Sequence, residues 1–130
     1  MKEKILVVED EERMRHLIAM MLKDYGHQVD EAGDGEAALE MIENAPYDLV
    51  ITDIKMPGMD GMELFRTLRE KNILCPLIFI TAFATIESAV EAMRDGAVDY
   101  ITKPFEEERL LLTVERTLGV SRILAENREL

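Results

Sequence analysis

The amino-acid sequence predicts an α/β fold in which helices alternate with the strands of a parallel sheet. Short apolar runs recur along the chain, and stretches with apolar residues at helical spacing separate them. The 130 residues suit one domain with a single core. The contents of 48% hydrophobic and 32% charged residues are ordinary for a soluble globular protein.

The first half of the chain supplies two strand-helix units and a third strand. Strands are predicted at 5–8, 28–31 and 49–52. Gly26 ends the first helix, and Asp34 caps the second, which closes at Asn44 and Pro46. Helical spacing predicts their buried faces, which are Met14, Leu17, Ile18, Met21 and Leu22 in the first helix and Ala38, Met41 and Ile42 in the second.

The second half repeats the pattern, with strands predicted at 77–80 and 99–102. Asp60, with Glu63 three residues later, has the capping-box spacing that begins a third helix. Gly96 ends the fourth helix, and Pro104 prevents the last strand from extending. The predicted buried faces are Met62, Phe65 and Leu68 in the third helix, Ile86, Ala89, Val90 and Met93 in the fourth, and Leu111, Val114 and Leu118 in the fifth.

The last helical pattern begins at Phe105 and is interrupted at Gly119. The residues beyond are too polar to belong wholly to a core, and they hold too few heptads to indicate a coiled coil. We therefore expect a domain at 1–119 and a helical linker or tail at 120–130.

Charge and composition narrow the possible partners. The formal net charge of -12 argues against direct contact with nucleic acid, which depends on Lys and Arg meeting phosphates. The chain has one cysteine, Cys75, which cannot form an intramolecular disulfide and so fits a protein of the reducing cytoplasm. We expect Cys75 to lie in the core. The first residues form neither a signal peptide nor a membrane span. His16 and His27 lack zinc-ligand spacing and are expected on the surface.

Three acidic residues follow two of the predicted strands: Glu9 and Asp10 follow the first, and Asp53 follows the third. In a parallel sheet these strand ends meet at one edge, where each close pair of carboxylates would cost about 4 kcal/mol at ~4 Å and an effective dielectric of ~20. A hard divalent cation such as Mg²⁺ would remove that cost. The sequence therefore predicts a metal site at this edge.

Thr81 and Lys103 finish two later strands and should reach the same edge. With a cation present, an exposed aspartate at position 53 can accept a phosphoryl group, while the hydroxyl and the ammonium stabilise its oxygens. Each residue alone is more often a helix cap or a solvated side chain, but five at corresponding strand ends favour a site. The periodicity alone places Tyr100 in the core.

The motifs around these residues closely resemble the receiver domain of two-component response regulators over roughly residues 3 to 120. The resemblance rests on Val7-Val8-Glu9-Asp10-Glu11, Asp53-Ile54-Lys55-Met56-Pro57-Gly58-Met59-Asp60-Gly61, Thr81-Ala82 and Lys103-Pro104-Phe105. It implies a doubly wound sheet of strand order 2-1-3-4-5 with five helices, a fold for which a receiver protein is a standard example. It also implies a cis peptide before Pro104.

The same resemblance implies a signalling switch and not a turnover enzyme. Asp53 resembles the phosphoacceptor for a sensor histidine kinase. Asp10 corresponds to a direct Mg²⁺ ligand, Glu9 to a ligand through water, and Lys55 to a ligand through its backbone carbonyl. Thr81 and Lys103 match the pair that holds the phosphoryl group, Tyr100 matches the switch aromatic, and Ala82 matches a small residue that leaves the site accessible.

The segment 81–93 is most similar to the nitrogen-regulation subgroup, whose receivers control a transcription-activating ATPase, and the polar tail resembles a linker to such an effector domain. A homodimer is expected through the face of the fourth helix, fifth strand and fifth helix, or through the C-terminal helix. Lys55 and Phe83 occupy positions that the family associates with phosphoryl lifetime. Neither can align a hydrolytic water, so slow self-dephosphorylation is expected.

Three rival functions are weighed against this switch. A magnesium-dependent phosphatase commonly needs an acid two residues after its nucleophile, where this chain has Lys55. A nucleotide or flavin binder needs a first turn rich in Gly, Ser or Thr, whereas residues 9–12 are all acidic. An interaction module that has lost phosphorylation is disfavoured by the intact set of site residues.

Overall fold

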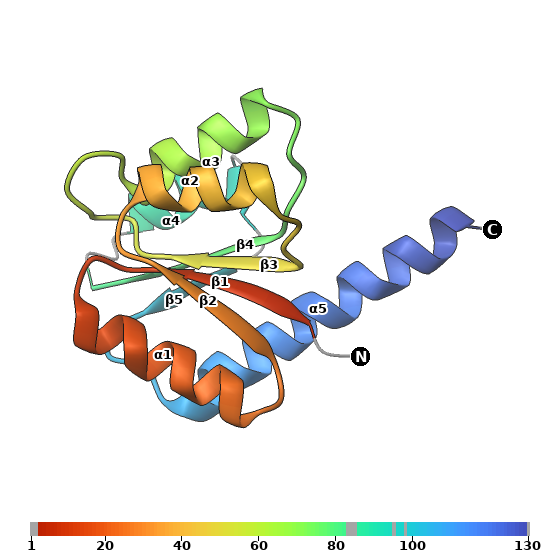
Figure 1. The fold of residues 1–130 in the computed structure, drawn as a ribbon, viewed down its shortest axis with the longest axis horizontal. Helices are drawn as coiled ribbons and strands as arrows, with labels where there is room; N and C mark the ends of the chain where they lie inside the picture. Colours follow the sequence, from red (N-terminus) through yellow and green to blue (C-terminus); the bar gives the residue numbers. More distant parts are fainter. Residues whose placement is uncertain (1–2, 83–85, 95, 98, 130) are drawn as a thin grey trace.

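The computed structural model describes residues 3–82, 86–94, 96–97 and 99–129, in which helices cover both faces of a five-stranded parallel sheet (Figure 1). The elements in chain order are β1 (Lys4–Val8), α1 (Glu12–Asp24), β2 (Gln28–Ala32), α2 (Gly35–Asn44), β3 (Leu49–Thr52), α3 (Gly61–Glu70), β4 (Leu77–Thr81), α4 (Ile86–Arg94), β5 (Asp99–Thr102) and α5 (Glu107–Glu129). All five predicted strands are present, and the α/β fold class is confirmed.

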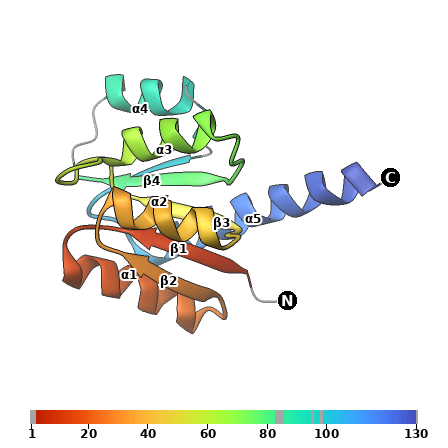
Figure 2. The ribbon, with the colours of Figure 1, turned by 45° about the horizontal axis from the view of Figure 1, so that its top comes forward.

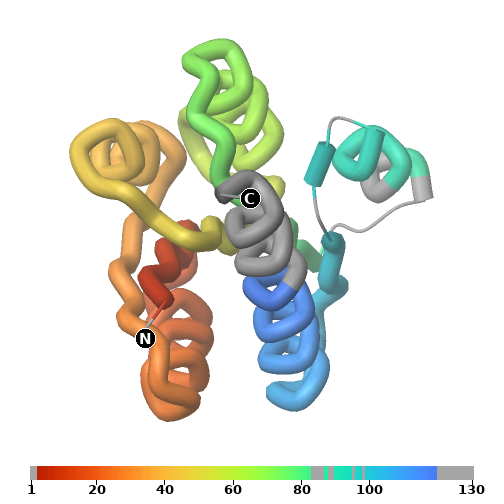
Figure 3. Tube along the Cα trace, turned by 90° about the vertical axis from the view of Figure 1, so that its right-hand side faces the viewer, coloured from red at the N-terminus to blue at the C-terminus, as the bar shows by residue number. Residues whose placement is uncertain are grey.

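The strand order is β2-β1-β3-β4-β5, as the family resemblance implies. The order reverses between β1 and β3, which pair directly with Val8 opposite Thr52. Helices α1 and α5 cover one face of the sheet, and α2, α3 and α4 cover the other (Figures 1 and 3). Figure 2 shows the same layers from a raised viewpoint. The residues that follow β1 and β3 therefore meet at the point where doubly wound sheets bind ligands.

The core has two halves because alternate residues of each central strand point to opposite faces. On β1, Leu6 and Val8 join the half under α2, α3 and α4, whereas Ile5 and Val7 join the half under α1 and α5. Phe79 of β4 is fully buried. Burial of each such large side chain contributes about 1.5–3 kcal/mol relative to exposure, so packing on both faces fixes the strand ends.

Several predicted helix boundaries are present. Asp34 Oδ1 accepts a hydrogen bond from the amide of Ala37 at 2.7 Å, and Asp60 Oδ1 accepts one from the amide of Glu63 at 2.9 Å. Each cap of this kind contributes about 1 kcal/mol. Gly26 follows α1 with φ of +104°, a conformation that glycine adopts without strain. The predicted cis peptide between Lys103 and Pro104 is also present.

Some predicted buried faces are wrong. Leu17 of α1 is 43% exposed, and Val90 and Met93 of α4 are 49% and 47% exposed. The buried residues of α1 are Ile18, Ala19 and Leu22, a narrower strip than the apolar spacing indicates, and among the described side chains of α4 the buried one is that of Ala92. The side chains of Ile86 and Ala89, also predicted on the buried face of α4, lie outside the described part of the chain.

Two further predictions need correction. Helix α5 runs through Gly119 without the predicted interruption, because the cost of about 1 kcal/mol for a helical glycine is too small on its own to end a helix. His27 is not a surface residue: its side chain is 7% exposed, and its Nε2 lies 2.8 Å from Glu115 Oε1 of α5. Among the described residues, no helix is both long and apolar enough to span a bilayer.

Candidate functional site

The carboxyl ends of β1 and β3 bring the three predicted acidic residues together. The amide of Asp53 donates to the Val8 carbonyl at 3.1 Å, and the amide of Glu9 donates to the Ala32 carbonyl at 3.1 Å, so the sheet ladder holds both backbones. Glu9, Asp10 and Asp53 each place a carboxylate oxygen within 4.8 Å of the other two. The predicted convergence of carboxylates is therefore present.

Lys103 inserts its ammonium group into this acidic cluster. Its Nζ lies 2.8 Å from Asp53 Oδ2 and also contacts Glu9 Oε1, and its side chain is only 15% exposed. The amide of Lys103 donates to the Thr81 carbonyl at 3.0 Å, which fixes the residue at the end of β5 beside β4. One cation thus bridges the two more buried acids of the cluster.

The negative charge of this cluster is only partly neutralised by Lys103, so a divalent cation could balance the rest. Three ionised carboxylates and one ammonium carry a net charge of about minus two, and carboxylate oxygens are the ligands that Mg²⁺ prefers. Asp10 is exposed, so one carboxylate of the cluster opens to solvent. The donor set therefore fits a hard divalent ion in oxygen coordination.

The electrostatic environment shifts two pKa values. Burial, and then the nearby charge of Asp53, raise the pKa of Glu9 from 4.5 to about 6, although the hydrogen bond from Lys103 acts in the opposite direction. Burial alone would lower the pKa of Lys103, but its hydrogen bonds to Asp53 and Glu9 and their negative charges raise it above 10.5. The ammonium is therefore charged at neutral pH.

The predicted exposure of Asp53 is wrong, because the residue is buried in the structure. Its side chain is 9% exposed because the Lys103 ammonium lies against one oxygen, and the amide of Lys55 donates to the other, Oδ1, at 3.2 Å. On the backbone side of Asp53, position 61 has no space for a side chain larger than that of glycine, because an ideal Cβ there would lie 2.1 Å from the Asp53 carbonyl oxygen. Asp53 is thus held firmly from both sides.

Four further predicted residues lie on β4 and β5 or follow β3 and β4. Thr81 ends β4 and is fully buried, and Ala82 after it is exposed. Tyr100 is half-buried on β5 and packs against the core under α4, in line with the placement from periodicity. Lys55 follows β3 and has an exposed side chain, and Phe83 lies outside the described residues.

Arg15 is a site neighbour that sequence reasoning missed. Its Nη1 donates to the Glu9 carbonyl at 3.0 Å from the first turns of α1. The available signal was a basic residue five positions after Asp10, where a helix beginning at position 12 turns back toward the acidic pair.

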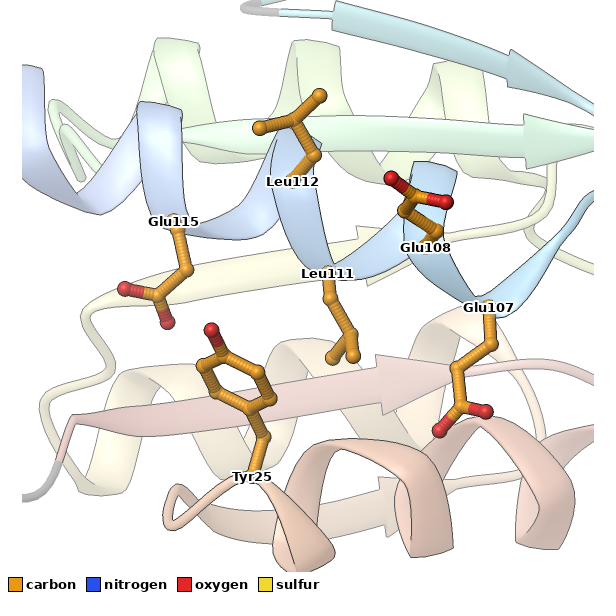
Figure 4. A pocket seen from close by; sticks show the side chains of 6 residues that line it. All are labelled: Tyr25, Glu107, Glu108, Leu111, Leu112 and Glu115. Atoms are coloured by element: carbon orange, nitrogen blue, oxygen red, sulfur yellow. The ribbon is translucent and has the colours of Figure 1, made fainter.

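A hollow lies away from this cluster, between the end of α1 and helix α5 (Figure 4). Its volume is about 400 Å³, and its lining residues are Tyr25, Glu107, Glu108, Leu111, Leu112 and Glu115. None of the predicted site residues lines it, so the acidic cluster is a separate feature.

Known regulatory proteins are similar in sequence to this chain. The chain is 37% identical to the regulatory protein AtoC of Escherichia coli over 127 residues, which cover 98% of this chain and 28% of AtoC. It is 38% identical to a putative NtrX-like response regulator of Rickettsia bellii over 128 residues, which cover 97% of this chain and 27% of that protein. The chain thus spans little more than a quarter of the length of these curated relatives.

Solved structures have the same fold as this chain. NtrX from Brucella abortus superposes with a TM-score of 0.92 at 38% identity, covering 99% of this chain and 29% of NtrX. The Francisella response regulator 1452 receiver domain superposes with a TM-score of 0.88 at 32% identity, covering 92% of this chain and 99% of that one. The family model described as the response regulator receiver domain matches residues 5–115. The chain therefore belongs to the receiver domain family of two-component response regulators, as its motifs predicted.

Proposed function

We propose that this receiver domain accepts a phosphoryl group on Asp53 from the phosphohistidine of a sensor histidine kinase, in a reaction that requires Mg²⁺. The observation that carries the proposal is the convergence of Glu9, Asp10 and Asp53 with the Lys103 ammonium at the switch point of the sheet. Family membership supports phosphorylation-dependent signalling in general, and this cluster supports the particular residues.

The acidic cluster supports a role in metal binding. In this proposal Asp10 and Asp53 hold Mg²⁺ directly, the Lys55 carbonyl adds a backbone ligand, and Glu9 acts through a water. When bound, the ion neutralises charge on the phosphoryl oxygens and so lowers the barrier to attack by a carboxylate. The exposure of Asp10 leaves that side of the cluster open to solvent.

The protein groups then divide the chemistry of transfer. A carboxylate oxygen of Asp53 attacks the phosphorus, the phosphorus-nitrogen bond of the donor breaks, and its electron pair returns to the imidazole of the kinase. The Lys103 ammonium, already 2.8 Å from Asp53, pairs with a phosphoryl oxygen, and the Thr81 hydroxyl donates to another. The protein thereby stabilises charge that develops during transfer.

The phosphorylated site should shift an equilibrium between two surface states. Movement of Thr81 toward the phosphoryl group would let Tyr100 follow and alter the face formed by α4, β5 and α5. We infer that this face, or the C-terminal part of α5, mediates a homodimer that regulates a transcriptional effector in the cytoplasm. The relatives' descriptions as regulatory proteins support this direction of output.

Phosphorylation by a small donor tests the proposal without the kinase. The chain is incubated with acetyl phosphate and Mg²⁺, and its intact mass is measured beside that of Asp53→Asn and of a sample with EDTA. One added phosphoryl group is expected in the wild type with Mg²⁺ only. A wild type that stays unmodified, or an Asp53→Asn variant that is modified equally, would overturn the proposal.

A further inference from the structure

We propose that Arg15 is a positioning residue for the magnesium site: it sets the backbone that carries Glu9 and Asp10 without entering the acidic cluster. This inference rests on the metal site proposed above. Arg15 is on the second turn of α1, and its side chain is 17% exposed. It touches no carboxylate oxygen of the cluster in any described contact, so its action must pass through the backbone.

The guanidinium of Arg15 joins two segments that flank the site. Its Nη1 donates to the Glu9 carbonyl at 3.0 Å, and its Nε lies 3.2 Å from Glu31 Oε1 of β2. Gly33 leaves space for the group, since an ideal Cβ there would lie 3.3 Å from Arg15 Nη1. Glu31 therefore anchors Arg15 on the sheet, and Arg15 transmits that anchorage to the β1–α1 turn.

The turn needs this anchorage because the ladder ends at Glu9. The amide of Glu9 still pairs with β2, through the Ala32 carbonyl, and its side chain reaches Lys103. Its carbonyl begins the peptide that leads to Asp10, and Arg15 is the described donor to that oxygen. Mg²⁺ demands near-ideal ligand geometry, so the orientation of this peptide decides where the Asp10 carboxylate lies.

The positive charge of Arg15 allows a test, because a charge effect and a positioning effect would change the Mg²⁺ affinity in opposite directions. A cation close to a metal site repels Mg²⁺, so removing it would tighten metal binding if charge were its only effect. If Arg15 acts by positioning, its removal weakens binding in spite of the lost repulsion. Lysine keeps the charge but lacks the planar fork that reaches Glu9 and Glu31 together, so Arg15→Lys should also weaken binding.

His16 offers a matched control. It is adjacent in sequence, and its Nδ1 lies 2.5 Å from Glu31 Oε1, the oxygen that also receives Arg15. His16 has no described contact with the Glu9 carbonyl. A His16→Ala variant thus perturbs the same anchor while leaving the bond from Arg15 to the turn in place.

The experiment measures Mg²⁺ affinity by calorimetry and amide hydrogen exchange at Asp10 and Glu11 in EDTA, for the wild type, Arg15→Ala, Arg15→Lys and His16→Ala. The expected result is a dissociation constant raised about tenfold in both Arg15 variants, as for other groups behind metal ligands. His16→Ala should stay within about twofold of the wild type. Exchange at the two amides should quicken in the Arg15 variants alone.

Each outcome bears on the inference. Unchanged or tighter Mg²⁺ binding in Arg15→Ala, or wild-type affinity in Arg15→Lys, overturns it. If the wild type itself does not bind Mg²⁺, the proposed metal site fails, and the exchange data collected without metal decide the positioning role alone. Equal exchange in the wild type and Arg15→Ala then overturns it, and faster exchange confined to the Arg15 variants supports it.

Discussion

The Lys103 ammonium nitrogen lies 2.8 Å from Asp53 Oδ2, and the same nitrogen contacts Glu9. Before any metal binds, a single cation therefore holds together two carboxylates whose side chains are only 9% and 3% exposed. The sequence predicted an electrostatic cost for bringing these acids close together. The Lys103 ammonium offsets part of that cost. The stability of the protein and the proposed metal binding should therefore depend on each other.

Replacement of Lys103 by methionine should destabilise the metal-free protein. Removal of one partner leaves two buried carboxylates without their cation, at a cost of about 3 kcal/mol in the free energy of unfolding. Urea denaturation in EDTA measures it, and excess Mg²⁺ should restore part of the loss. The double variant Lys103→Met with Asp53→Asn should lose less than Lys103→Met alone. A double variant that is equally unstable would argue against charge as the cause.

Glu9 should make the stability of the metal-free protein depend on pH. Its pKa is about 6 when folded and 4.5 ordinarily, so between these values the folded protein holds a proton that the unfolded chain has released. The bound proton contributes about 2 kcal/mol to the free energy of unfolding. This contribution is fully present below pH 4.5 and is lost as the pH rises through 6.

The Glu9→Gln variant isolates this contribution from other titrating groups. Relative to the wild type, its free energy of unfolding should rise by about 2 kcal/mol between pH 4.5 and pH 7. Urea denaturation of both proteins across that range in EDTA provides the comparison. A difference that stays constant with pH would show that Glu9 titrates at its ordinary pKa.

Alanine at position 61 should disturb the backbone that carries Asp53. The added methyl group would lie 2.1 Å from the Asp53 carbonyl oxygen, which cannot yield without moving the site. We expect a loss of about 2 kcal/mol or more in the free energy of unfolding, together with weaker Mg²⁺ binding. Gly119→Ala is the control, because in the described part of the chain no atom beyond its sequence neighbours and its own helix backbone lies within 4 Å of its ideal Cβ, and helical alanine should stabilise α5. Equal effects of the two substitutions would contradict this account.

The aspartyl phosphate should decay slowly in the presence of Mg²⁺. The Lys55 side chain is exposed beside the site and offers neither a carboxylate nor an amide to align an attacking water. Loss of the phosphorylated mass over time, after removal of the donor, measures the lifetime. Lys55→Gln would add an amide at that position and should shorten it. A wild-type half-life well below a minute would be inconsistent with this prediction.

The sequence predicted the strands and their ends because apolar runs here stop abruptly at charged or polar residues. β1 gives way to Glu9, β3 gives way to Asp53, and β5 gives way to Lys103. Parallel pairing then brings those residues to one edge whatever the details of the helices. The strand order came from the family resemblance, since the run lengths alone do not fix which strands are neighbours.

Helix faces and supporting contacts were harder to predict. Leu17 and Val90 fit the helical spacing, but how much of a helix surface the sheet covers depends on the packing angle, which no local pattern encodes. The contact of Arg15 with the Glu9 carbonyl depends on how the β1–α1 turn folds back. The burial of Asp53 depends on Lys103, fifty positions later in the chain.

The central claim is that the Asp53 carboxylate, and neither Glu9 nor Asp10, receives the phosphoryl group. Reduction of the phosphorylated chain with borohydride converts an aspartyl phosphate into homoserine, and peptide mass mapping then locates the converted residue. The account predicts homoserine at position 53 alone, formed only when Mg²⁺ accompanied the donor. Conversion at position 10, a reduced glutamate at position 9, or an unconverted position 53 in phosphorylated protein would contradict it.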